Sequence, residues 1–279
     1  MQGKPEVLIV GAGFAGLYAI HRFRRLGLEV QVLETGTDVG GTWYWNRYPG
    51  ARCDVPSLEY SFGFSPELEQ EWDWPEVFSA QEDILKYANH VADRFDLRRN
   101  IRFNTRVIAV EYIEVEQLWR LTAESGEIFE AAYCVMATGC LSVPNKPQLQ
   151  GADDFSGLTL HTGLWPKEPV DLSGKRVGII GTGSSAVQAI PELAELSGHL
   201  TVFQRTPVYT VPANRKRIRE AVREEFKDNY PRIRELQWNN QGGVSNFRPV
   251  KSLATNRPSN ARRGEGALIK PMTSEQRQQ

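Results

Sequence analysis

The fold of this 279-residue chain is decided by a stretch near its start, Val7-Leu8-Ile9-Val10-Gly11-Ala12-Gly13-Phe14-Ala15-Gly16. Four apolar residues predict a short strand, and the glycines predict a tight turn after it. A helical pattern follows as far as Gly27, with apolar residues at positions 17, 20, 23 and 26. A second apolar run, residues 30–33, ends at Glu34. Strand, glycine turn, helix and strand in this order predict one βαβ unit.

This glycine turn has the pattern of a dinucleotide-binding fingerprint, G-x-G-x-x-G. Gly11 permits the tight turn, Gly13 lets the backbone approach a pyrophosphate, and Gly16 lets the helix pack closely on the strand. The pyrophosphate is expected at the positive N-terminus of the helix, with Glu34 accepting hydrogen bonds from a ribose diol. Such a turn can also join a strand to a helix without binding anything, but the complete context favours a nucleotide site.

The same pattern returns about 170 residues later. Residues 177–180 predict a strand, positions 187, 190, 193 and 196 an apolar helix face, and residues 200–203 the next strand. From Gly11 to Glu34 and from Gly181 to Gln204 the chain advances by 23 residues in each case. The second turn consists of Gly181, Thr182, Gly183, Ser184, Ser185 and Ala186. We therefore interpret the two stretches as two copies of one structural unit.

The second copy differs from the first in two ways. Ala186 replaces the third glycine, a variant that the fingerprint tolerates. No acid ends the second strand, where Gln204, Arg205 and Thr206 stand instead. A carboxylate would repel a 2′-phosphate, whereas an arginine and a hydroxyl can bind one, so we predict NADP(H) here. The alternative is that Arg205 is an ordinary surface arginine. FAD is then the economical prediction for the first site, because flavin can take a hydride from nicotinamide.

The chain between and after the two copies has other textures. Residues 41–78 are rich in Trp, Tyr, Pro and Gly and predict an ordered loop region, and residues 81–95 predict a helix. Strand-like patterns at residues 101–112, 118–123 and 128–135 predict a small antiparallel sheet. A polar helix is expected at residues 217–238.

We expect an α/β fold with two Rossmann-like dinucleotide-binding units, for FAD and NADP, and a small antiparallel β insertion. The predicted domains are an FAD-binding domain (its N-terminal part) at residues 1–145, a partial NADP-binding domain at 146–240 with a linker at 146–174, and a disordered tail at 241–279. This is the organisation of a two-dinucleotide-binding-domain flavoprotein.

Composition excludes several classes of function. The formal charge is −1, which argues against a nucleic-acid-binding protein. Three scattered cysteines, with no C-x-x-C pair, predict neither a disulfide framework nor a metal site. No run approaches the roughly 18 apolar residues of a membrane span, and the N-terminus does not read as a signal peptide. We therefore expect a cytoplasmic protein with no membrane partner.

The segment between the two glycine turns carries a resemblance to a known family. The pattern Phe155-x-Gly157-x-x-x-His161-x-x-x-Trp165-Pro166 resembles the signature of Baeyer–Villiger monooxygenases. Residues 40–54, GGTWYWNRYPGARCD, also look like that family, in the style of its phenylacetone and steroid monooxygenase branch. The resemblance covers about residues 5–252. Flavin monooxygenases that oxidise nitrogen or sulfur are similar too, but their signature ends in Tyr or Phe where this chain has Trp165-Pro166.

The resemblance implies an FAD- and NADPH-dependent monooxygenase. In the family, NADPH reduces FAD, and O₂ adds at C4a to give a peroxyflavin. This attacks a ketone carbonyl, and one oxygen atom is inserted to give an ester or lactone. By resemblance, Asp54 is the active-site carboxylate, partnered by an arginine above the flavin. By the same resemblance, Arg52, Cys53 and Asp54 line the nicotinamide side.

The resemblance also implies the remaining contacts. His161 is a linker residue that couples the two nucleotide domains, not a catalytic base. Ala15 stands where close relatives have a serine near the FAD phosphates, which removes one hydrogen bond. The implied flavin contacts are Gly41, Thr42, Trp43 and Tyr60, with Val107 at the adenine end.

The resemblance fails in one respect, because family members are considerably longer. No arginine of residues 253–279 lies in the context of the family's catalytic arginine, and the family-like pattern ends near residue 252. We therefore expect a truncated flavoprotein that lacks its C-terminal half. A parallel sheet without its closing strands should have low stability. We attribute the tail to a changed or prematurely ended reading frame. A non-catalytic nucleotide-binding fragment is therefore an alternative. A disulfide reductase would need a redox pair, and Cys134 and Cys140 are six residues apart.

Overall fold

The computed structural model describes residues 4–213, 215–245 and 247. It divides into two compact units, Met1–Ile218 and Arg219–Gln279. The domain boundaries expected at residues 145 and 240 stay a prediction. Most of the tail expected to be disordered lies outside the described residues.

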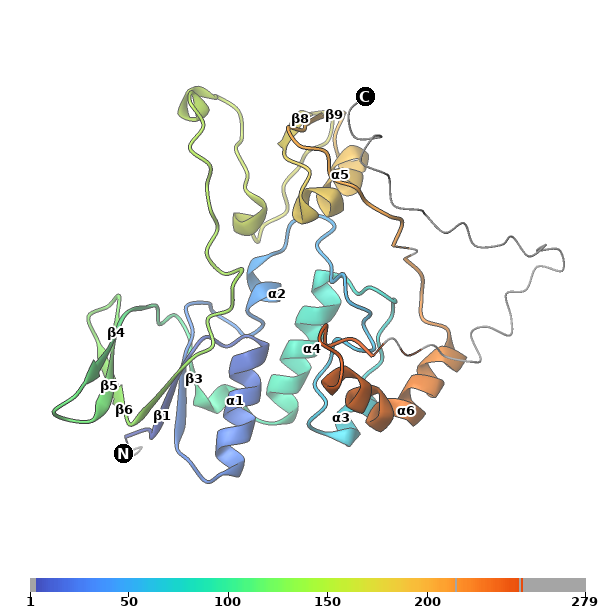
Figure 1. The fold of residues 1–279 in the computed structure, drawn as a ribbon. Coiled ribbons are helices and arrows are strands. Elements are labelled where there is room, and N and C mark those ends of the chain that lie inside the picture. The colour runs from blue at the N-terminus through green and yellow to red at the C-terminus, as the bar shows by residue number, and fades with distance from the viewer. Residues whose placement is uncertain (1–3, 214, 246, 248–279) are drawn as a thin grey trace, which may run out of the picture. The chain divides into compact units, whose positions relative to one another are not determined.

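The first unit is built on a four-stranded parallel sheet (Figure 1). Its strands are β1 (Val7–Val10), β2 (Val30–Leu33), β3 (Ile101–Arg102) and β7 (Tyr133–Met136), in the order β3-β2-β1-β7. Helix α1 (Phe14–Arg25) forms the crossover between β1 and β2 and packs against both. The first three residues of β1 are completely buried, as expected for a central parallel strand. The predicted βαβ unit is therefore present.

A separate antiparallel sheet packs against the parallel one. It contains β4 (Val107–Ile113), β5 (Leu118–Ala123) and β6 (Ile128–Ala131), in the order β4-β5-β6. Leu121 and Phe129 from this sheet join Leu8 and Leu33 of the parallel sheet in one buried apolar cluster. Burial of this shared face holds the insertion on the nucleotide-binding unit.

The prediction for the antiparallel sheet is wrong in part, because two of its three expected strands also contribute residues to the parallel sheet. The run 101–112 divides, and its first two residues pair with β2 in the parallel sheet. The run 128–135 divides likewise, and Tyr133–Met136 pairs with β1. The break in the first run falls near Asn104, whose left-handed backbone (φ +55°) turns the chain. Local apolar pattern identifies strands, but it does not say with which sheet they pair.

The loop region at 41–78 contains two short helices, α2 (Thr42–Trp45) and α3 (Pro66–Glu71). Ser65 caps α3 by accepting a hydrogen bond from the Leu68 amide, and Pro66 takes the first helical position. Helix α4 (Gln81–Arg94) ends one residue before the predicted bound. Single 3₁₀ turns lie at Arg98–Asn100 (η1), Ala152–Asp154 (η2) and Thr162–Leu164 (η3).

The second glycine motif forms a smaller parallel unit. Strands β8 (Arg176–Ile180) and β9 (His199–Phe203) pair in parallel and are connected by helix α5 (Ser184–Leu196). Ala189 and Leu193 of α5 share a buried cluster with Tyr48 and Ala51 of the loop region. The core of this unit is therefore completed by residues of the 41–78 loop region. Apolar side chains on the two parallel sheets that remain exposed include Tyr133, Met136, Ile180 and Phe203.

The unit Arg219–Gln279 contains helix α6 (Glu220–Trp238), with Phe226, Tyr230 and Ile233 buried. The helix begins three residues later than predicted. Residues 217 and 218 pair instead with the backbone of residues 75–76, so they are extended. In the part of the chain that the structure describes, no helix is both long and apolar enough to cross a membrane.

Candidate dinucleotide-binding and active site

The first glycine turn is tightly closed. A Cβ at Gly16 would lie 2.0 Å from the Gly11 carbonyl oxygen, so only glycine fits where α1 crosses the turn. The Gly40–Gly41 segment lies against the same turn. A Cβ at Gly41 (φ +54°) would lie 2.7 Å from the Gly13 Cα. Two motifs that the sequence keeps about 30 residues apart are thus in backbone contact.

Glu34 lies at the edge of this turn, as the fingerprint predicts. Its side chain is only 5% exposed, and its two carboxylate oxygens accept hydrogen bonds from the Ala12 amide (2.6 Å) and the Gly36 amide (2.7 Å). These bonds fix the carboxylate beside the N-terminal end of α1. Each oxygen retains a further lone pair, so the group can still accept hydrogen bonds from a ribose.

Aromatic residues gather beside the turn. Trp43 Nε1 donates a hydrogen bond to the Tyr60 hydroxyl at 3.0 Å, and the Tyr60 ring contacts the Phe14 ring edge-on at 5.5 Å. Burial raises the pKa of the Tyr60 phenol, so this group is held as a neutral donor. Gly41, Thr42, Trp43 and Tyr60, the predicted flavin contacts, therefore lie together. Val107 is apart from them, half-buried against the shared core of the two sheets.

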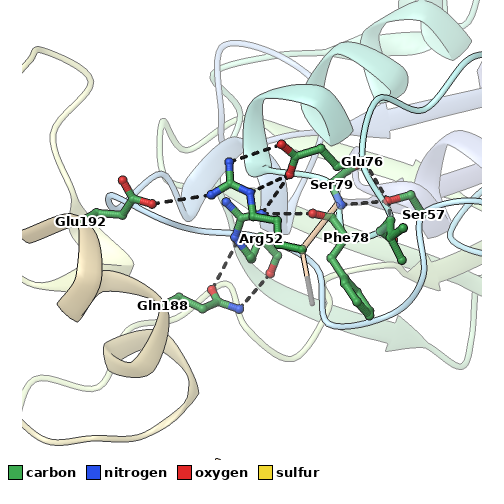
Figure 2. A network of polar contacts seen from close by, with 9 residues as sticks. Arg52, Ser57, Glu76, Phe78, Ser79, Gln188 and Glu192 are labelled. Carbon is green, nitrogen blue, oxygen red and sulfur yellow. Dashed lines mark hydrogen bonds and ion pairs between the residues drawn. The ribbon is translucent and has the colours of Figure 1, made fainter. Parts of the chain in front are cut away.

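Arg52 and Asp54 lie on the same loop but have different surroundings. The Arg52 guanidinium donates to the Phe78 carbonyl at 3.0 Å and faces Glu76 at 3.4 Å (Figure 2). A hydrogen bond from Arg215, with a smaller contribution from Arg52, lowers the pKa of the Glu76 carboxyl. Asp54 is exposed, and its charge contributes to the raised pKa of Tyr60 after burial itself. Asp54 is thus exposed, whereas the Arg52 guanidinium is held by Phe78 and Glu76.

Helix α5 is attached to this loop through Gln188, which the sequence analysis did not single out. Gln188 Oε1 accepts from the Tyr48 hydroxyl (2.8 Å) and from the Arg52 amide (3.3 Å). Gln188 Nε2 donates to the Arg52 carbonyl at 3.1 Å (Figure 2). A single side chain thus pairs with both backbone groups of Arg52. The only sequence signal was a polar residue on a largely apolar helix.

The second glycine turn is more open. Apart from the chain neighbours of each glycine, no atom of the described residues lies within 4 Å of a Cβ built at Gly181 or Gly183, and α5 begins directly after the turn at Ser184. Gln204 Nε2 donates to Thr182 Oγ1 at 2.9 Å, which brings the end of β9 to the turn. Ser185 is half-buried and Ala186 is buried on the helix. Arg205 and Thr206 are exposed just beyond β9. The predicted residues of this site therefore surround one accessible helix N-terminus.

The signature segment has a defined local structure. His161 Nδ1 accepts from the Gly163 amide at 3.1 Å, and Nε2 lies 3.3 Å from the Asn145 carbonyl. Both ring nitrogens of His161 therefore contact backbone groups of its own segment. Trp165 packs against the buried cluster formed by Tyr48, Ala51 and residues of α5. Phe155 is exposed with its ring over Gly157, and Pro166 is half-buried.

The cysteines do not form a redox pair. Cys53, Cys134 and Cys140 are all free, and burial raises the pKa of the Cys53 thiol to about 11. Among the described residues, no three His, Cys, Asp or Glu side chains are grouped to hold a metal ion.

Comparison with known proteins identifies the family. A model described as pyridine nucleotide-disulphide oxidoreductase matches residues 8–244. The chain belongs to this family. It is 47% identical over 235 residues to a Baeyer–Villiger monooxygenase of Pseudooceanicola batsensis, and 43% identical over 229 residues to the phenazine N-monooxygenase PhzNO1 of Lysobacter antibioticus. These matches cover 84% and 82% of the chain but only 42% of each relative. The chain thus spans less than half the length of the curated relatives it matches.

Solved structures agree with these relatives. An oxidized steroid monooxygenase bound to NADP superimposes with a TM-score of 0.84 at 49% identity, covering 91% of this chain and 49% of that one. The OTEMO complex with FAD and NADP gives a TM-score of 0.82 at 38% identity, covering 88% and 47%. The resemblance to Baeyer–Villiger monooxygenases is confirmed, and so is the expected two-dinucleotide α/β fold. The family's name refers to disulphide chemistry, but the three cysteines of this chain are all free.

Proposed function

We propose that this chain binds FAD at the first glycine turn and NADPH at the second. It supplies this part of a monooxygenase that inserts one oxygen atom of O₂ next to a ketone carbonyl, giving an ester or lactone. One observation carries the proposal, namely that the loop of residues 40–60 contacts both glycine units. Gly41 lies against Gly13 at one end of the loop, and Arg52 is paired with Gln188 of α5 at the other.

The residues of the first turn fit FAD. Gly13 carries no side chain that would keep a pyrophosphate from the backbone of the turn, and the N-terminal end of α1 favours the charge of that group. The fixed Glu34 carboxylate receives the ribose hydroxyls. The Trp43–Tyr60 pair supplies an apolar wall with one phenolic hydrogen for the ring system.

The residues of the second turn fit NADPH. The space around Gly183 admits a pyrophosphate at the start of α5, where Thr182, Ser184 and Ser185 supply hydroxyls. Arg205 and Thr206 are exposed just beyond β9, and we assign them to the ribose 2′-phosphate. A guanidinium there favours a phosphate and gives no acceptor to a free ribose diol, which selects NADPH over NADH.

Bound FAD supplies hydride acceptance from NADPH and the activation of O₂. The chain's own residues place the reactants. Asp54 provides the active-site carboxylate. The Arg52 backbone, two residues before it, is fixed to α5 by the Gln188 contacts, so α5 helps to position Asp54. His161 shapes the linker between the two nucleotide-binding regions, assigned to residues 1–145 and 146–240, through its bonds at Asn145 and Gly163.

The experiment is a titration of the purified chain with FAD, followed by addition of NADPH, O₂ and either a ketone or a sulfide. Quenching of FAD fluorescence and formation of ester from the ketone support the proposal. N-oxidation is the second candidate, because PhzNO1, named as a phenazine N-monooxygenase, is 43% identical to this chain. Oxidation of an amine or sulfide without any ester would favour that candidate. Absence of FAD binding would reject both.

A further inference from the structure

Lys167 connects the signature segment to the loop beside the first glycine turn. It directly follows Trp165-Pro166, yet its ammonium lies 2.7 Å from the Tyr44 hydroxyl and 3.3 Å from Thr37 Oγ1. The same ammonium lies 4.8 Å from the centroid of the Tyr44 ring. A lysine next to the signature segment thus contacts Thr37 and Tyr44, which lie 130 and 123 positions earlier in the chain.

The Tyr44 hydroxyl is the centre of this cluster. It also accepts a hydrogen bond from the Thr37 amide (3.1 Å) and exchanges one with Thr37 Oγ1 (2.8 Å). Tyr44 is 6% exposed. Burial alone would raise the pKa of its phenol, but the hydrogen bonds from Lys167 and Thr37 outweigh burial and lower that pKa. The phenol oxygen is therefore the acceptor of a charge-assisted bond in a partly desolvated setting.

This cluster borders the proposed FAD site. The Tyr44 ring packs on Gly36, where an added Cβ would lie 2.8 Å from the ring. The Gly36 amide in turn holds the Glu34 carboxylate. Tyr44 also belongs to α2, whose N-terminal neighbour Gly41 contacts the first glycine turn. A displacement of Lys167 would therefore loosen the backbone on which the ribose-binding carboxylate depends.

We propose that Lys167 is a positioning residue that fastens residues 36–44 to the signature segment and thereby sets the affinity for FAD. The inference rests on the proposed FAD site and deepens it. Lys167 is identified by its contacts alone, because the dinucleotide fingerprint does not include a lysine at this place in the chain.

The test compares Lys167→Met with the matched control Lys146→Met. Lys146 belongs to the same connecting stretch, is exposed, and has no polar partner among the described residues. We expect Lys167→Met to weaken FAD binding about tenfold, the effect of one charge-assisted hydrogen bond, and Lys146→Met to leave it unchanged. Lys167→Arg keeps the charge and should restore most of the affinity. Circular dichroism verifies that each variant is folded.

A second readout separates positioning from a general structural effect. Ultraviolet titration of tyrosinate, with the Tyr44→Phe variant subtracted, isolates the Tyr44 phenol. Its pKa should rise in Lys167→Met and not in Lys146→Met. Equal FAD affinity and an unchanged Tyr44 titration in Lys167→Met would overturn the inference. Failure of the unaltered chain itself to bind FAD would instead refute the proposed site, so the two failures are distinguishable.

Discussion

Replacement of Gly50 by alanine tests how helix α5 is held on the loop that contains Tyr48 and Arg52. Gly50 has a left-handed backbone (φ +81°), and a Cβ there would lie 2.2 Å from the Gln188 carbonyl oxygen. It would also lie 2.9 Å from Glu192 Cγ. The backbone atom cannot move without shifting α5. Gly27 is the matched control, because its φ is +78° and no atom lies within 4 Å of its Cβ position.

Both variants are destabilised by alanine in a left-handed backbone, but only Gly50→Ala also meets a steric clash. Left-handed alanine destabilises each by about 1 kcal/mol. Forced separation of packed elements adds roughly 1–3 kcal/mol for Gly50→Ala only. Urea unfolding followed by tryptophan fluorescence measures the difference in free energy of unfolding. Hydrogen exchange should also increase at the Arg52 amide in Gly50→Ala. Equal losses of stability in the two variants, with unchanged exchange at Arg52, would refute the described packing.

Further predictions concern single side chains. Glu34→Gln should weaken FAD binding about tenfold in a fluorescence titration, since a carboxylate acceptor is lost, and an unchanged affinity would contradict its ribose role. Arg205→Ala should reduce the preference for NADPH over NADH, as measured by the two dissociation constants, while NADH affinity stays the same. Cys53 should resist alkylation at pH 8 while exposed Cys140 reacts, as peptide mass spectrometry would show. Because the pKa of the folded Cys53 thiol is about 11 against an ordinary 9.0, the unfolded state loses its proton first, so this group makes stability fall as the pH rises from about 9 towards 11. Cys53→Ala should remove that part of the pH dependence in thermal unfolding, and an identical pH profile would contradict it.

The nucleotide units were predictable from sequence because their information is local. The turn at Gly11–Gly16 needs particular residues at fixed spacing, and the crossover helix follows directly. Strand pairing was less predictable, since Ile101 and Tyr133 join the parallel sheet through partners far away in the chain. The side chains that connect the motifs were missed for the same reason. Gln188 and Lys167 act over 136 and 123 positions of sequence, and neither belongs to a spacing rule.

The measurement that tests the account most directly is anaerobic reduction of the FAD-loaded chain by NADPH, followed by flavin absorbance. The account predicts that the chain binds FAD, that NADPH bleaches it, and that NADH does so much more weakly because Arg205 lies at the second site. A chain that takes up no FAD, or whose bound flavin NADPH leaves oxidised, would contradict the claim that both glycine turns hold cooperating nucleotides.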